Sequence, residues 1–228
     1  MSWEPEYRVL DLFAGLGGFS ASFEDSDRWD VTTVEINPAF EPDITADVFD
    51  LTPSDFEQDF DVIVASPPCQ YLNTAGNHDR WDFDNREPTA AESRNAVALF
   101  YHALGLIRSL SPTYWYVENP RASRIRWFIG PPDEWVTYCQ YGTDYQKPTG
   151  LWGNHAPMTF RRCSAGGNCH VSNTETDGAE AIASMNHISQ PERSLVPYEL
   201  SDAIRGACEE ALDGDAPTQT TADEWVQA

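Results

Sequence analysis

The residue in this sequence that is best suited to chemistry is Cys69, which follows two prolines in the stretch ASPPCQYLNTAG (65–76). The preceding run DVIVA (61–65) predicts a buried strand, which the prolines end abruptly. A thiol at such a strand end can act as a nucleophile when a positive charge or a helix terminus favours its thiolate form. The alternative is a buried cysteine that serves only as a small apolar side chain. The candidate positive charges are Arg80, Arg86, Arg94 and Arg121.

A carboxyl group is the second candidate. Glu118 ends the apolar run YWYVEN (114–119). A carboxyl group at that depth costs free energy unless it is used or paired, and burial could keep it protonated so that it donates to a ring nitrogen. A salt bridge to Arg121 or Arg124 is the structural alternative. A cysteine nucleophile with a carboxylic acid indicates attack on a heterocycle, followed by group transfer.

Three glycines, Gly15, Gly17 and Gly18, follow an expected strand in DLFAGLGGFSASF. They allow a tight turn that brings a ligand close to the main chain before a helix begins. Glu35 lies 20 residues after Gly15, where an acidic side chain in such folds accepts hydrogen bonds from a ribose. The pattern predicts an adenosine-containing cofactor, and its departure from G-x-G-x-x-G disfavours NAD or FAD. Asp47 could reach the adenine amino group, and a simple loop carboxylate explains it equally well.

These residues need strands to position them. We expect strands at 7–15, 30–36, 61–65 and 114–119, and an amphipathic helix at 90–110. Alternating strands and helices predict an α/β protein with a doubly wound parallel sheet, and ligands of such sheets bind at the carboxyl ends of the strands. The glycine turn, Glu35, Cys69 and Glu118 should therefore converge on one crevice.

The remainder of the chain divides by composition. We expect a catalytic domain at 1–150, a small irregular insert at 151–192, a helix at 193–212 that packs back on the domain, and an acidic tail at 213–228. Pro197 lies near the start of the helix, and Ser201 is the expected cap of its helical part.

The charge is strongly negative. Of 14 cationic residues only Lys147 is a lysine, whereas Asp and Glu total 37, for a formal net charge of -23. Such a surface stays hydrated where salt screens its self-repulsion, which suggests a halophilic source. No apolar window is long enough for a membrane span and the N-terminus is acidic, so we expect a cytoplasmic protein with no membrane partner. Five cysteines in such a chain favour reduced thiols.

In combination these stretches resemble the cytosine-5 DNA methyltransferases, especially the compact type found in phages and haloarchaea. DLFAGLGGFS resembles the first cofactor motif of that family, VEIN the second and ADVFDL the third. SPPCQ resembles the catalytic proline–cysteine motif, VENP the glutamate motif usually written ENV, and VPYELSDAIRGA the closing helix. The first five occur in the family's order between about residues 8 and 120, which chance does not readily explain.

The resemblance implies a Rossmann-like class I methyltransferase that uses S-adenosyl-L-methionine. Cys69 would attack C6 of a cytosine flipped out of double-stranded DNA, and Glu118 would bind the N3 and amino edge of the base. Loop 70–90 is the candidate lid, and we expect a monomer. The cofactor-binding residues would be Phe13, Gly15, Gly17, Gly18, Glu35, Ile36, Asp47, Val48 and Pro67. The substrate-binding residues would be Gln70, Asn119, Arg121, Gln146 and Lys147.

One family element departs from its pattern. The Q-x-R-x-R element is matched only by QKPTG (146–150), where Pro148 and Gly150 stand at the arginine positions. Lys147, or Arg124 with Arg126, could replace the arginines.

Binding a polyanion would need a local basic face on the acidic body. Ten of the 14 cations fall within residues 80–162, which makes such a face plausible. The recognition region is at most the 151–192 insert, with Arg161 and Arg162 as candidates for phosphate contact.

The stretch CSAGGNCH (163–170) suggests zinc, but its spacing does not match a common zinc finger. Because a fourth ligand such as Cys139 is unassigned, the expectation is that no metal is bound. Two alternatives to DNA methylation stay open. RNA cytosine-5 methylation uses the same chemistry, although one PPC cysteine with VENP favours DNA. A catalytically silent binding module is disfavoured by the presence of both Cys69 and Glu118.

Overall fold

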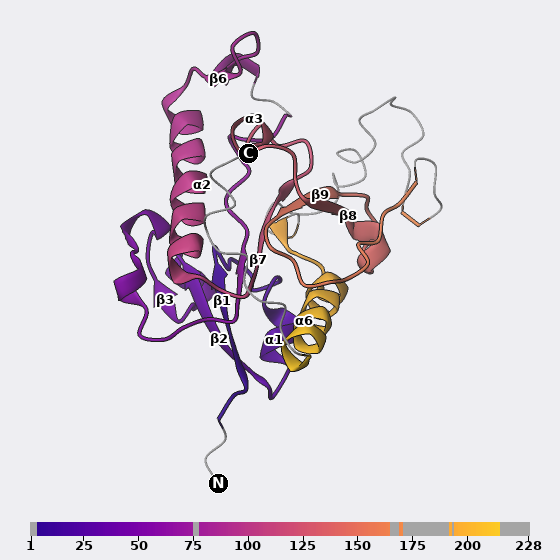
Figure 1. The fold of residues 1–228 in the computed structure, drawn as a ribbon. Helices are drawn as coiled ribbons and strands as arrows, with labels where there is room; N and C mark the ends of the chain where they lie inside the picture. The colour runs from indigo at the N-terminus through magenta and orange to yellow at the C-terminus, as the bar shows by residue number, and fades with distance from the viewer. Residues whose placement is uncertain (1–3, 75–77, 165–168, 171–191, 193, 215–228) are drawn as a thin grey trace.

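The computed structural model describes residues 4–74, 78–164, 169–170, 192 and 194–214. Its centre is a seven-stranded sheet with the order β3-β2-β1-β4-β7-β9-β8 (Figure 1). The parallel strands are β1 (Tyr7–Leu12), β2 (Trp29–Glu35), β3 (Ile44–Thr45), β4 (Val62–Ala65) and β7 (Tyr114–Pro120). The prediction of a doubly wound parallel sheet is therefore confirmed, with an antiparallel edge that the sequence did not predict.

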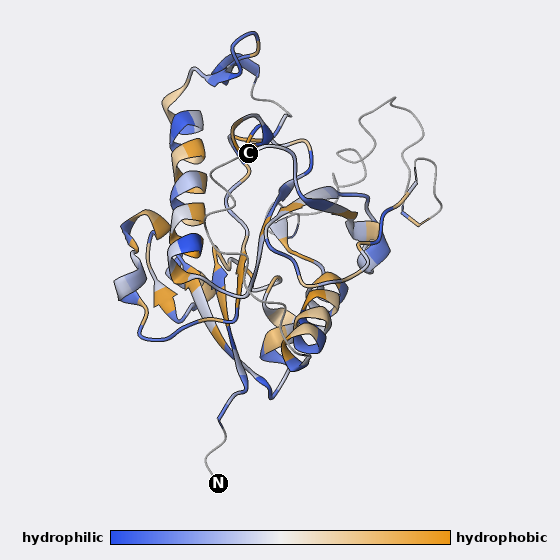
Figure 2. Cartoon of the chain, in the orientation of Figure 1, coloured by the Kyte–Doolittle hydropathy of each residue, from blue (hydrophilic) through white to orange (hydrophobic). Residues whose placement is uncertain are grey.

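The central strands are buried on both faces, as expected for a parallel sheet covered by helices. Val9, Val62 and Val64 pack in one core cluster, whereas the alternate residues Leu10 and Ile63 pack in another. Figure 1 shows α2 on one side of the sheet and α1 and α6 on the other. The apolar colour of the strands in Figure 2 lies between the helices, with polar positions outside.

The connections between the strands contain one long helix and several short elements. α2 (Ala91–Leu110) covers one face as predicted, and ends where Ser111 adopts the left-handed conformation (φ 53). The helix after the glycine turn, α1 (Ala21–Glu24), is only one turn long. Between β4 and α2 a small hairpin forms from β5 (Trp81–Asp82) and β6 (Glu87–Pro88), and α3 (Arg126–Ile129) follows β7.

The second half of the sheet is antiparallel. β9 (Pro148–Trp152) pairs with β7, and β8 (Glu134–Thr137) pairs with β9. The 3-10 turn η5 (Tyr138–Tyr141) joins the end of β8 to the approach to β9. Three further 3-10 turns follow β2 and β3, namely η1 (Pro38–Phe40), η2 (Val48–Asp50) and η3 (Pro53–Asp55), and η4 (His78–Arg80) precedes β5. β9 crosses the predicted boundary at residue 150, and most of the expected 151–192 insert lies outside the described residues.

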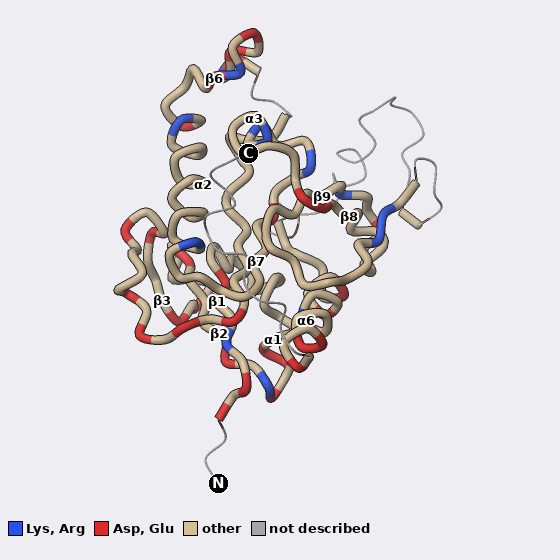
Figure 3. The backbone as a smooth tube through the Cα atoms, in the orientation of Figure 1, with Lys and Arg blue, Asp and Glu red and all other residues tan. Residues whose placement is uncertain are grey.

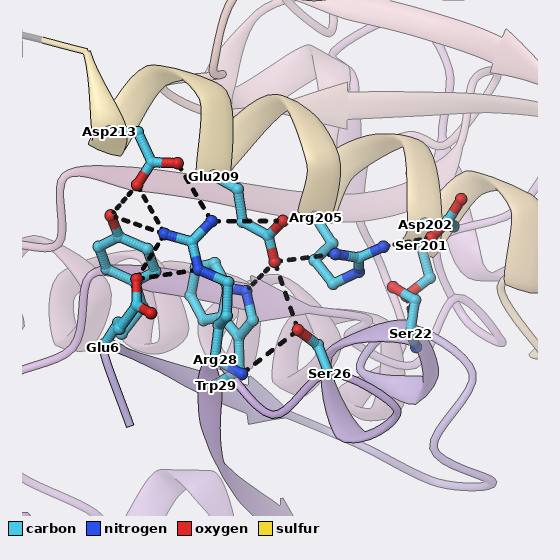
Figure 4. A network of polar contacts seen from close by, with 11 residues as sticks. Glu6, Ser22, Ser26, Arg28, Trp29, Ser201, Asp202, Arg205, Glu209 and Asp213 are labelled. Carbon is cyan, nitrogen blue, oxygen red and sulfur yellow. Dashed lines mark hydrogen bonds and ion pairs between the residues drawn. The ribbon is translucent and has the colours of Figure 1, made fainter. Parts of the chain in front are cut away.

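The closing helix α6 (Tyr198–Asp213) packs on α1. Ser201 lies inside this helix instead of capping it, so that prediction is wrong: its hydroxyl donates to the Phe19 carbonyl (2.7 Å) and bonds the Ser22 hydroxyl (2.7 Å). At the outer end of α6, Glu209 accepts from the Trp29 indole (2.7 Å) (Figure 4). Arg28 is bound there by both Glu6 and Asp213. Polar contacts therefore fix the last helix to the first strands.

No helix among the residues that the structure describes is long and apolar enough to cross a membrane.

Candidate active site

The turn after β1 has the positive φ angles that suit glycine, in agreement with the tight turn that the sequence predicts. Phe13, Gly15 and Gly17 all have positive φ angles (66, 54 and 75). A side chain at Gly17 would meet open space. Gly18 differs, because a Cβ there would lie 2.6 Å from the Val196 carbonyl oxygen. Gly15 and Gly17 thus shape an open turn, whereas Gly18 allows the approach of the segment before α6.

Glu35 braces this turn from the neighbouring strand. Its carboxylate accepts from the Gly15 amide (3.1 Å) and, with the other oxygen, from the Asn37 amide (2.9 Å). Ile36 beside it is 61% exposed, which is unusual for so apolar a side chain. Glu35 therefore fixes the turn at the edge where Ile36 presents an apolar surface.

Asp47 and Val48 lie beyond β3. The Asp47 carboxylate caps η2 by accepting from the Phe49 amide (3.0 Å), which agrees with the loop-carboxylate explanation. Val48 is buried, and Phe49 is 41% exposed. These residues lie just beyond the carboxyl ends of β2 and β3, at the same end of the parallel strands as the glycine turn.

Cys69 begins a tight turn after β4. Its carbonyl accepts from the amides of Leu72 (3.0 Å) and Asn73 (2.9 Å), and the side chain is half-buried. Burial raises the pKa of the Cys69 thiol, the negative charge of Glu118 raises it further, and the positive charge of Lys147 lowers it. The thiol follows β4 and Glu118 lies in the neighbouring parallel strand β7, where Ala65 pairs with Val117.

Glu118 is 4% exposed and belongs to a buried polar group of three residues. Its Oε1 accepts from the Tyr138 hydroxyl (3.1 Å) and from the Lys147 ammonium (3.2 Å), and that ammonium also lies 4.5 Å from the centre of the Tyr138 ring. The predicted alternative, a salt bridge to Arg121 or Arg124, is wrong: among the described residues the cation paired with Glu118 is Lys147.

Asn119 ties the glutamate strand to the cysteine loop. Its side-chain amide donates to the Pro67 carbonyl (2.9 Å), two residues before Cys69. Asn119 is fully buried, so it supports the loop from beneath instead of offering its amide to the surface. A second link runs from the Arg124 amide to the Leu72 carbonyl (2.7 Å). The fold thus holds Cys69 and Glu118 at the carboxyl ends of two neighbouring parallel strands.

The other expected substrate-binding residues lie around this centre. Gln70 is exposed, and Gln146 is half-buried beside Lys147. Arg121 is exposed with its guanidinium 3.9 Å from the centre of the Trp135 ring, and Arg162 lies over the same ring at 4.8 Å. Arg121 and Arg162 therefore share one indole as a partner, and Arg162 also pairs with Glu134.

The expected lid is anchored at one strand. Trp81 in β5 is buried, donates to the Tyr71 carbonyl (3.1 Å) and contacts Trp127 edge to face at 5.6 Å. Arg124 is also fully buried, where it lies 5.3 Å from the Trp81 ring and binds the Asn73 carbonyl. Arg124 is thus occupied in supporting the 70–90 segment.

Two buried residues near the site were missed by the sequence reasoning. Tyr138 sits in an aromatic stretch without a pattern that marks it as a partner of Glu118. Asp11 lies inside β1 beneath the glycine turn and is fully buried. Burial raises the pKa of Asp11 to about 7, and neither carboxyl oxygen has a hydrogen-bond partner among the described residues. A carboxyl group within an otherwise apolar strand was a signal that could have identified it.

Similarity to known proteins follows these motifs. Residues 7–122, just over half of the chain, match the family described as C-5 cytosine-specific DNA methylase. The chain is 29% identical to a probable DNA (cytosine-5)-methyltransferase of frog virus 3, over 71% of this chain and 77% of that protein.

Two bacterial relatives are longer. The type II methyltransferase M.DdeI of Desulfomicrobium norvegicum is 31% identical over 49% of this chain and 27% of its own length. M.HaeII of Haemophilus aegyptius is 30% identical over 50% of this chain and 35% of its own length. This chain thus spans about a third or less of these two relatives.

Among solved structures, TrmN from Thermus thermophilus aligns with a TM-score of 0.40 and 14% identity over 65% of this chain and 43% of that one. The match across the glycine turn, the cysteine loop and the glutamate strand places this chain in the C-5 cytosine-specific DNA methylase family.

Proposed function

We propose that this protein methylates carbon 5 of cytosine in DNA, with S-adenosyl-L-methionine as the methyl donor. The observation that carries the proposal is the common support of Cys69 and Glu118. Asn119, next to Glu118, holds the Pro67 carbonyl of the cysteine loop at 2.9 Å, and the Glu118 charge acts on the Cys69 thiol. This arrangement supports a mechanism in which Cys69 adds to a pyrimidine ring and Glu118 stabilises the charge that results.

The residues at the glycine turn fit the proposed cofactor. Phe13, Gly15 and Gly17 would line the site, and Gly18 would support the turn. Glu35 would accept from the ribose hydroxyls with lone pairs left by its two backbone bonds. The adenine would lie against exposed Ile36, with Asp47 and Val48 at its edge and buried Pro67 nearby. When bound, S-adenosyl-L-methionine supplies an electrophilic methyl group.

The mechanism assigns one task to each side chain. The Cys69 thiolate would add to C6 of the cytosine, which places negative charge on the ring and makes C5 nucleophilic. Glu118, in its protonated form when the base is bound, would donate to N3, where that charge develops, and would accept from the amino group. After C5 takes the methyl group, water would remove the C5 proton, the bond between C6 and the Cys69 sulfur would break to release the thiolate, and the C5–C6 double bond would re-form.

Lys147 is the best candidate to replace the arginines missing from the Q-x-R-x-R element. It reaches the Glu118 carboxylate from the start of β9, whereas Arg124 is buried against Trp81. Its ammonium would hold Glu118 in place and add positive charge next to the ring. Arg126 is exposed on α3 and makes neither contact among the described residues.

The charge distribution supports DNA as the substrate of an acidic protein. Figure 3 shows mainly acidic positions around β2, β3 and α6, whereas basic positions lie near α3 and, mixed with acidic ones, near β8. Arg121 and Arg162 are exposed beside Trp135 in the basic region. Phosphate contact there would orient the duplex, and extrusion of the target base would cost a few kcal/mol.

A trapping experiment tests the proposal. Duplex DNA of random sequence that carries 5-fluorocytosine, incubated with S-adenosyl-L-methionine in concentrated KCl, should form a covalent adduct that survives denaturing electrophoresis, because fluorine at C5 blocks release of the enzyme. Cys69→Ser should form none. Cys208→Ala is the matched control, since it removes a buried thiol on α6 and leaves the site intact. Adducts with an RNA oligonucleotide but not with DNA would indicate the RNA alternative, and no adduct with either would favour a silent module.

A further inference from the structure

Three cysteines and one histidine from separate parts of the chain meet beside the antiparallel edge of the sheet. The Sγ atoms of Cys139, Cys163 and Cys169 and a ring nitrogen of His170 all lie within 4.8 Å of one another. Cys139 is buried and the other three are half-buried. All three thiols are free, so no disulfide accounts for the cluster.

Three of the separations within the cluster are close to the edges of a zinc coordination tetrahedron. Zinc bonds of about 2.3 Å to sulfur and about 2.0 Å to nitrogen give edges of about 3.8 Å between sulfurs and about 3.6 Å between sulfur and nitrogen. The Cys169 Sγ lies 3.6 Å from the Cys139 Sγ and 3.6 Å from the His170 Nδ1, and the Cys163 Sγ lies 3.7 Å from the same nitrogen. The contact between Cys163 and Cys169, at 3.0 Å, is shorter than such an edge.

The sheet explains why the sequence did not reveal this set. Cys139 lies in η5, directly after β8, and Cys163 returns along the same strand end. The Cys163 amide donates to the Thr137 hydroxyl (2.6 Å), and the Thr137 amide donates to the Arg161 carbonyl (3.3 Å). These bonds bring Cys163 against η5, where Cys139 supplies the fourth ligand whose absence argued against a metal.

We propose that Cys139, Cys163, Cys169 and His170 bind one zinc ion in a structural site. Three thiolates and an imidazole form a closed set of four protein ligands, which is typical of structural zinc and leaves no position for a water or a substrate. The sequence-based expectation of no metal is replaced by this proposal. It is independent of the proposed methylation.

The metal would tie Cys163, Cys169 and His170 to η5, which borders the active site. Cys139 directly follows Tyr138, whose hydroxyl donates to Glu118. Loss of zinc should therefore loosen η5 and disturb the carboxylate through Tyr138. Zinc would act here by positioning, at a distance from the reacting atoms.

Metal analysis of the full-length protein tests the site. Protein purified with a reductant and without added chelator should contain about one zinc per chain by mass spectrometry of elements. Cobalt exchanged into the site should give the intense visible bands of tetrahedral Co²⁺ and a thiolate charge-transfer band. His170→Cys should keep the metal and strengthen the charge-transfer band, because a fourth thiolate replaces the imidazole. Cys163→Ser should lose most of the metal.

Cys69→Ala is the matched control, because it removes a thiol outside the cluster and should retain the full zinc content even if methylation is lost. The wild-type result stands even if Cys163→Ser does not fold. Folded wild-type protein with less than about one zinc per ten chains, and no cobalt spectrum after reconstitution, would overturn the proposal. So would a Cys163–Cys169 disulfide found by mass mapping in protein kept under reductant.

Discussion

The ammonium group of Lys147 lies 3.2 Å from the carboxylate of Glu118, and both side chains are buried. Glu118 belongs to β7, and Lys147 directly precedes β9, the antiparallel neighbour of β7. A charge pair at this depth is expensive to break, because removal of one partner leaves the other ion buried without compensation. Lys147 is thus both a support for Glu118 and the single lysine of the chain.

Replacement of this lysine should therefore harm both stability and activity. Lys147→Met should lower the free energy of unfolding by about 3 to 5 kcal/mol, because Glu118 loses its counter-charge. Chemical denaturation measures the stability, and adduct formation with 5-fluorocytosine DNA measures the activity. Lys147→Arg keeps the charge and should retain more of both. Equal stability of Lys147→Met and the wild type would show that the pair is not formed in solution.

The bond between Asn119 and Pro67 can be tested by removal of the amide. Asn119→Ala should cost about 1 to 3 kcal/mol of stability, since a buried carbonyl loses its donor. Adduct formation should slow by more than tenfold while binding of S-adenosyl-L-methionine, measured by calorimetry, changes little. Asn154→Ala is the matched control, because this exposed side chain donates to the Thr113 carbonyl (2.8 Å) just before the opposite end of β7. An equal loss of activity in both variants would contradict a specific support of the cysteine loop.

The charges near Cys69 should be visible in the reactivity of its thiol. Because Glu118 raises the pKa of Cys69, Glu118→Gln should shift the pH dependence of alkylation by iodoacetamide to lower pH. Because Lys147 lowers that pKa, Lys147→Met should shift the dependence to higher pH. Peptide mass spectrometry can follow Cys69 alone among the five cysteines. Shifts of the same sign in the two variants would be inconsistent with the observed placement of the charges.

Asp11 should make stability fall as the pH rises. Its pKa is raised from 3.8 to about 7 by burial, so the folded chain binds this proton more tightly than the unfolded chain does. The free energy of unfolding should therefore decrease between about pH 4 and pH 7, by at most roughly 4 kcal/mol, and level off above that range. Asp11→Asn should remove this decrease, as measured by denaturation at several pH values. Asp84→Asn, an exposed position, should not.

The acidic surface should make stability depend on salt. We expect the melting temperature to rise as KCl goes from dilute to multimolar, since screening weakens repulsion among 37 acidic residues. Exposed pairs such as Arg28 with Asp213 weaken under the same conditions, but each contributes little. A variant with Glu57→Lys and Asp59→Lys, both exposed positions, should depend less on KCl. A melting temperature that does not rise would count against a halophilic adaptation.

The sequence predicts the parallel half of this fold well, because its strands are apolar runs that end at glycine or proline. Because these strands run parallel, Glu35, Cys69 and Glu118 lie at the same, carboxyl, end of the sheet. The antiparallel half was not predictable in the same way. QKPTGLW mixes a charge, a proline and a glycine, so nothing local indicates that Lys147 enters the core next to Glu118.

The same limit applies to contacts between distant segments. Cys139 meets Cys163 only because β8 and the returning chain lie side by side. Ser201 has the side chain of a helix cap, and only the position of α1 shows that its hydroxyl is used for helix packing. Gly18 is a further example. The sequence of the turn predicts a glycine with conformational freedom, whereas its close contact with Val196 depends on the position of the segment before α6.

The docking of α6 on α1 has a consequence for biosynthesis. Leu200 and Ile204 of α6 pack in the same core cluster as Val9 and Phe23. The packing of these two early residues is therefore complete only after α6 has been synthesised. Until α6 has been synthesised, one face of the nascent sheet stays uncovered and its apolar surface is open to chaperones or to other unfinished chains. Burial of this face therefore depends on synthesis of α6, and truncation within α6 should leave an insoluble product.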